Sequence, residues 1–130
     1  MKTLKTVETL TARLLEIQRI NSAASLLSWD QETYMPARGG EARAEQISTL
    51  QGIAHQKLVS PKMEGLLATW IDPQTGAIQD TPGEGWDEPS RSLLREVWRD
   101  YSRAKNLPSD FVITLSRECS LAKQFWAEAK

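Results

Sequence analysis

Apolar residues recur three or four positions apart along most of the chain, which is the spacing of one face of an α-helix. The first stripe covers residues 4–24, and a second strip over residues 15–27 widens it. No Pro or Gly interrupts this stretch before Pro36. The pattern predicts a long amphipathic helix whose apolar face is wider than a two-stranded coiled coil needs.

Two more helices are predicted after the break at Pro36–Gly40. One begins at Glu41, carries apolar residues at the same spacing and should end before Ser60. Ser60 then resembles an N-cap followed by Pro61 at the first helical position, which is a strong local start signal. A short helix ending near Trp70 should follow it.

The second half of the chain is also predicted to be helical, after an irregular Pro- and Gly-rich loop around residues 72–89. Asp87 or Ser90 is expected to cap a helix carrying Leu94, Val97, Trp98, Tyr101 and Ala104. Ser109 is expected to cap the last helix, which carries Phe111, Val112, Leu115, Cys119, Ala122 and Trp126.

The fold class predicted from this pattern is all-α, with about five helices arranged in long antiparallel pairs. We expect residues 1–130 to form a single helical domain. The last helix shows no stop signal before Lys130, so we also expect the chain to be part of a longer protein.

Composition excludes several classes of function. Sixteen basic residues nearly balance seventeen acidic ones and do not form a basic block, so nucleic acid is not an expected partner. No stretch is apolar and long enough to span a membrane, and the start lacks the apolar run of a secretory signal. With a single cysteine as well, the expected location is the cytoplasm.

Residues that could carry chemistry are few. The five tryptophans are expected mainly in the core or in packing between helices. A catalytic metal needs two or three ligands brought together, and the chain has one histidine and one cysteine. We expect His55 to be partly exposed or to cap its helix, and Cys119 to be a buried, unreactive thiol.

The stretch "LLSWDQETYMPARGGEARAEQ", residues 26–46, places the carboxylates Asp30 and Glu32 near two aromatic residues and two arginines. Asp30 and Glu32 could divide acid and base roles if burial separated their pKa values. The alternative is a folded turn in which these carboxylates pair with arginines. That turn would be built from Trp29, Asp30, Glu32, Tyr34, Met35, Arg38 and Arg43.

The segment "AASLLSWDQETYMPARGGEARAEQISTLQGIAHQKLVSP" resembles the N-terminal region of the carboxypeptidase Taq family of metallocarboxypeptidases. The segment "LREVWRDYSRAKNLPSDFVITLSRECSLAKQFWAEAK" is similar to the next part of the same family. The resemblance implies a helical enzyme that removes C-terminal residues from peptides. It also implies zinc or cobalt in the full-length enzyme, held by an HExxH helix and a further glutamate.

This chain contains no HExxH, so no catalytic, cofactor-binding or metal-binding residue can be carried over from the family. The resemblance therefore implies an N-terminal portion that shapes a wall or lid of the peptide cleft and is inactive alone. The alternative is a helical interaction module without catalysis. Its partner would be a second copy or the missing C-terminal part, bound through the apolar faces of residues 4–27 or 111–126.

Overall fold

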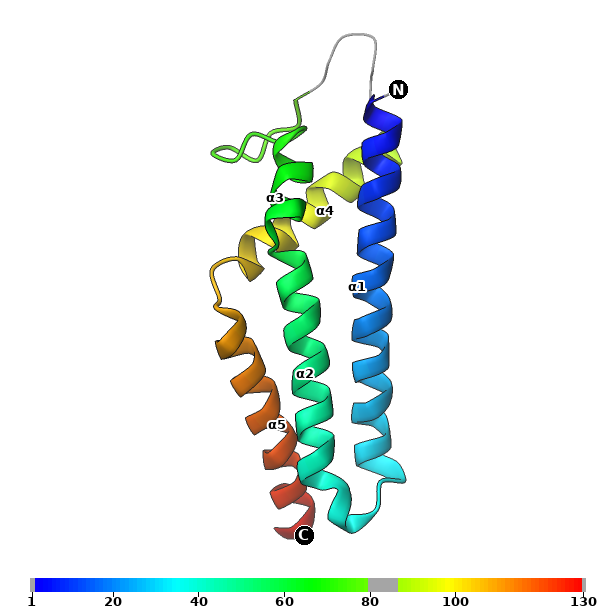
Figure 1. The fold of residues 1–130 in the computed structure, drawn as a ribbon, viewed down its shortest axis with the longest axis vertical. Coiled ribbons are helices and arrows are strands. Elements are labelled where there is room, and N and C mark those ends of the chain that lie inside the picture. The colour runs from blue at the N-terminus through cyan, green and yellow to red at the C-terminus, as the bar shows by residue number, and fades with distance from the viewer. Residues whose placement is uncertain (1, 80–86, 130) are drawn as a thin grey trace. The chain divides into compact units, whose positions relative to one another are not determined.

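A computed structural model describes residues 2–79 and 87–129 of the chain. It confirms the predicted all-α fold (Figure 1). The helices are α1 (Lys2–Thr33), the short 3-10 helix η1 (Ala37–Gly39), α2 (Gly40–Leu58), α3 (Pro61–Ala68), α4 (Glu88–Ala104) and α5 (Ser109–Ala129). Within the described residues, no helix has the length and apolar character that a membrane span requires.

Two of the predicted helix starts are confirmed. The Ser60 hydroxyl accepts a hydrogen bond of 3.3 Å from the backbone N–H of Met63, and Pro61 is the first residue of α3. The Asp87 carboxylate caps α4 by accepting a 2.9 Å hydrogen bond from the N–H of Ser90. This hydrogen bond holds the pKa of Asp87 below its usual value, so protonating Asp87 would weaken the cap.

The chain divides into two compact units, and each has its own set of buried residues. The first comprises residues 1–15 and 57–106, and the second comprises residues 16–56 and 107–130. The expectation of one domain over the whole chain stays a prediction.

The first unit has an apolar core. Leu10 of α1 is buried, together with most of the apolar residues predicted for α4, of which Trp98 and Ala104 are half-buried. Arg13 of α1 ties the unit together by donating a 2.7 Å hydrogen bond to the Ser60 hydroxyl. The other buried apolar residues of this unit are Met63, Leu67, Trp70, Ile71, Leu94, Val97 and Tyr101.

Residues 72–79, the first part of the predicted irregular loop, form a closed turn. An antiparallel bridge joins Ile71 to Ile78, and Gly76 adopts a φ of 72°, which favours glycine. A Cβ on Gly76 would lie 2.8 Å from the indole nitrogen of Trp98, so the turn also packs closely against α4. The rest of that loop, including Trp86, lies outside the described residues.

The second unit is a three-helix arrangement of α1 from residue 16 onward, α2 and α5. α2 packs against both of the others and runs antiparallel to each (Figure 1). Two glycines allow α5 to approach α2 closely. A Cβ on Gly40 would lie 1.7 Å from the Gln124 side-chain oxygen, and a Cβ on Gly52 would lie 2.5 Å from Ile113 Cγ1.

Most of the apolar stripe predicted for α5 is exposed in this unit. Phe111, Leu115 and Trp126 are about half or more exposed, and the buried residue of α5 is Ser120. Cys119 is also exposed, against the prediction of a buried thiol. The α5 helix directs Ile113 and Ser120 toward α2 and α1, and this orientation leaves Phe111, Leu115 and Trp126 on the outside.

The tryptophans of the two units also differ in burial. Trp70 is buried and Trp98 is half-buried, as predicted, whereas Trp29 and Trp126 are 54% and 69% exposed. The prediction of core positions is therefore wrong for the two that belong to the second unit.

Candidate functional site

The stretch 26–46 is the turn between α1 and α2. The carbonyl of Asp30 accepts hydrogen bonds from the N–H groups of Tyr34 and Met35, at 3.0 and 2.9 Å, and these bonds close the end of α1. Pro36 leads into η1, and Gly40 begins α2. The chain therefore reverses direction between Thr33 and Gly40, and α1 and α2 lie side by side.

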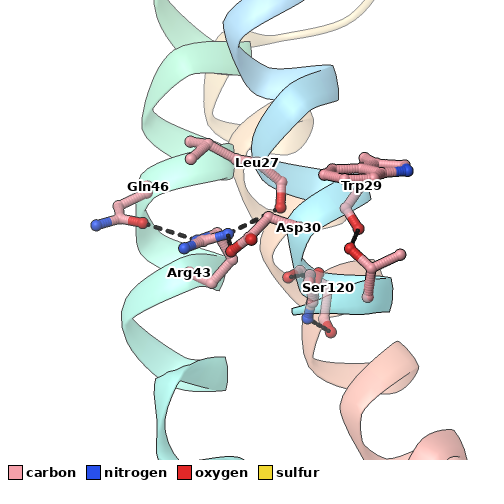
Figure 2. A network of polar contacts seen from close by, with 8 residues as sticks. Leu27, Trp29, Asp30, Arg43, Gln46 and Ser120 are labelled. Atoms are coloured by element: carbon pink, nitrogen blue, oxygen red, sulfur yellow. Dashed lines mark hydrogen bonds and ion pairs between the residues drawn. The ribbon is translucent and has the colours of Figure 1, made fainter. Parts of the chain in front are cut away.

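Arg43 is the side chain that joins these two helices. Its Nη1 donates to the Asp30 carboxylate at 2.7 Å and to the carbonyl of Leu27 at 3.0 Å (Figure 2). Its Nε donates to the side-chain oxygen of Gln46 at 3.0 Å. Arg43 is mostly buried and Asp30 is partly buried, so the predicted Asp–Arg pair exists and is partly shielded from water.

Glu32 faces a different partner. Its carboxylate lies 3.2 Å from Nζ of Lys123 on α5, and the same lysine donates to the Ser28 hydroxyl at 3.2 Å. Asp30 therefore pairs toward α2 and Glu32 pairs toward α5. The two carboxylates hold separate cations, so the arrangement favours the folded-turn interpretation over a shared acid–base pair.

The other predicted site residues lie around the outside of the turn. Trp29 and Tyr34 are exposed, and their rings contact each other with centroids 5.7 Å apart. Met35 is half-buried and packs on Gly39, where a Cβ would lie 3.1 Å from the Met35 Cγ. Arg38 is exposed in η1. Their proposed role in shaping a cleft wall stays a prediction.

Sequence reasoning missed the contacts between α1 and α5. The Gln31 amide donates to the carbonyl of Ser120 at 2.9 Å, and the Ser120 hydroxyl donates back to the Gln31 oxygen at 2.9 Å. Arg117 of α5 also pairs with Glu45 of α2, and this hydrogen bond raises the pKa of Arg117. Polar pairs this far apart in sequence leave no periodic signal that could predict them.

His55 is buried, against the prediction of a partly exposed or capping residue. Its Nδ1 lies 2.7 Å from the hydroxyl of Ser109, which is the first residue of α5 and not its N-cap. The prediction failed because it used the spacing of residues along α2 alone. In the structure, Ser109 at the start of α5 lies against His55.

The described residues contain no group of three or more His, Cys, Asp or Glu side chains placed to hold a metal ion. The whole sequence also has one histidine and therefore no HExxH. The residues present do not fit the metal that the family resemblance implies, and no catalytic step can be assigned to them.

A hollow in the second unit lies between the turn and the C-terminal half of α5. It has a volume of about 960 Å³. Its lining is mainly apolar, with Glu32 and Lys123 among the charged residues at its edge. The residues that supply its apolar surface include Met35, Ala37, Ala122, Trp126 and Ala127.

Comparison with known proteins identifies the kinship of the chain. Residues 9–130 match the model of the carboxypeptidase Taq (M32) metallopeptidase family. The chain is 31% identical over 123 residues to thermostable carboxypeptidase 1 of Thermus thermophilus, which covers 90% of the chain and 22% of that protein. It is 29% identical over 127 residues to thermostable carboxypeptidase 1 of Pyrococcus furiosus, covering 97% of the chain and 23% of that protein.

Carboxypeptidase 1 of Bacillus subtilis is a further relative, 26% identical over 121 residues, covering 90% of the chain and 22% of that protein. No solved structure matches the chain. The chain thus spans about a fifth of the length of the curated relatives it matches. Because the family model covers nearly all of the sequence, the chain belongs to the carboxypeptidase Taq (M32) metallopeptidase family.

Proposed function

We propose that residues 1–130 form the N-terminal, cleft-wall portion of a metal-dependent carboxypeptidase that removes C-terminal residues from peptides. The observation that carries this proposal is the family match over residues 9–130 together with the short coverage of each relative. In this proposal the metal ligands and the catalytic glutamate come from residues outside this chain. The contribution of the chain is shape and support.

The turn at residues 26–46 suits such a supporting role. Its charged side chains are engaged in holding helices together, as Arg43 does with Asp30 and Lys123 does with Glu32. The turn therefore fixes the positions of α1, α2 and α5, and the exposed rings of Trp29 and Tyr34 supply apolar surface.

The proposal predicts that the purified chain has no peptidase activity. The test is a C-terminal residue release assay on a short peptide, with zinc or cobalt added in excess, and with the intact Thermus thermophilus relative as the positive control. The expected result is release by the control and none by the chain. Release by the chain, together with one bound metal ion per molecule, would overturn the proposal.

A second candidate function is a helical interaction module that pairs with another copy of itself. The exposed apolar residues of α5 favour it, because large exposed apolar patches often mark interfaces. Sedimentation over a wide concentration range tests it. A stable dimer is expected on this alternative, and a monomer at high concentration contradicts it.

A further inference from the structure

We draw no further inference here: the strongest candidate, the exposed apolar face of α5 with the hollow beside the turn at residues 26–46, carries nothing, because nothing in the part of the chain that the structure describes shows what covers it.

Discussion

The helices α4 and α5 look alike in sequence and differ in what they bury. Both carry apolar residues three or four positions apart over several turns. In α4, Leu94, Val97 and Tyr101 are buried, whereas α5 buries Ser120 and leaves Phe111 and Leu115 exposed. Helical spacing therefore shows which residues share a face, and it does not show what that face packs against.

The difference extends to what holds each unit together. The first unit has an apolar core and a turn packed on Trp98. The second unit also buries apolar residues, but they are smaller, and side-chain hydrogen bonds and ion pairs such as Arg43 with Asp30 add to them. Its buried apolar residues are Ile17, Ala24, Ala44, Ile47 and Ala54. Less apolar area is buried per residue in such a core, and each polar contact adds about 0.5–1.5 kcal/mol net, so this unit is expected to be less stable.

The largest expected effect compares one leucine from each helix. Leu94→Ala should lower the free energy of unfolding by about 2–5 kcal/mol, because Leu94 is 1% exposed and its removal leaves a cavity. Leu115→Ala should lower it by less than about 1 kcal/mol, since half of Leu115 already contacts water. Urea unfolding followed by circular dichroism measures both.

Equal losses of unfolding free energy from Leu94→Ala and Leu115→Ala would contradict the difference in burial between α4 and α5. They would mean that α5 buries its apolar side in solution, for example against a second copy. Repeating the measurement at two protein concentrations separates these cases, because a self-associated stripe makes the effect of Leu115→Ala depend on concentration.

The fold was predictable where local signals are strong. Ser60 and Pro61 marked the start of α3, and Asp87 marked the start of α4, because caps and prolines act over one helical turn. The Asp30–Arg43 pair was also foreseeable, because the turn brings these residues together.

What failed depended on contacts between residues far apart in sequence. The burial of His55 follows from Ser109 on another helix, and the exposure of Cys119 follows from the rotation of α5. No single-helix pattern contains that information. The apolar spacing of α5 described one face of the helix correctly, and it did not show that this face is exposed.

A second prediction uses glycine to separate close helix packing from open surface. Gly52→Ala should cost about 1–3 kcal/mol, because the added Cβ would lie 2.5 Å from Ile113 Cγ1 between α2 and α5. Gly65→Ala is the matched control in α3, where a Cβ meets nothing within 4 Å. It should stabilise the chain by about 0.5–1 kcal/mol through helix propensity.

The midpoint of thermal unfolding should therefore fall for Gly52→Ala and rise for Gly65→Ala. If Gly52→Ala leaves the free energy of unfolding unchanged, α5 can move away from α2. The orientation of α5 that exposes its apolar stripe would then not be fixed. A destabilising Gly65→Ala would show that α3 is covered by something beyond the described residues.

The smallest effect concerns the two carboxylates of the turn. Asp30→Asn should lower the free energy of unfolding by about 1 kcal/mol, because it removes a charge paired with mostly buried Arg43. Glu32→Gln should change it by at most about 0.5 kcal/mol, because Glu32 and Lys123 are both about half exposed and water screens their attraction. Urea unfolding at low and high salt measures the difference.

These two substitutions also separate a structural turn from a catalytic one. If the turn is structural, Asp30→Asn lowers the free energy of unfolding, and added salt reduces the small effect of Glu32→Gln further. Neither substitution then changes peptide hydrolysis by the chain. A hydrolytic activity of the chain that both substitutions abolish, with unfolding unchanged, would contradict it. The charged side chains of the turn would then act on a substrate instead of holding α2 and α5 against α1.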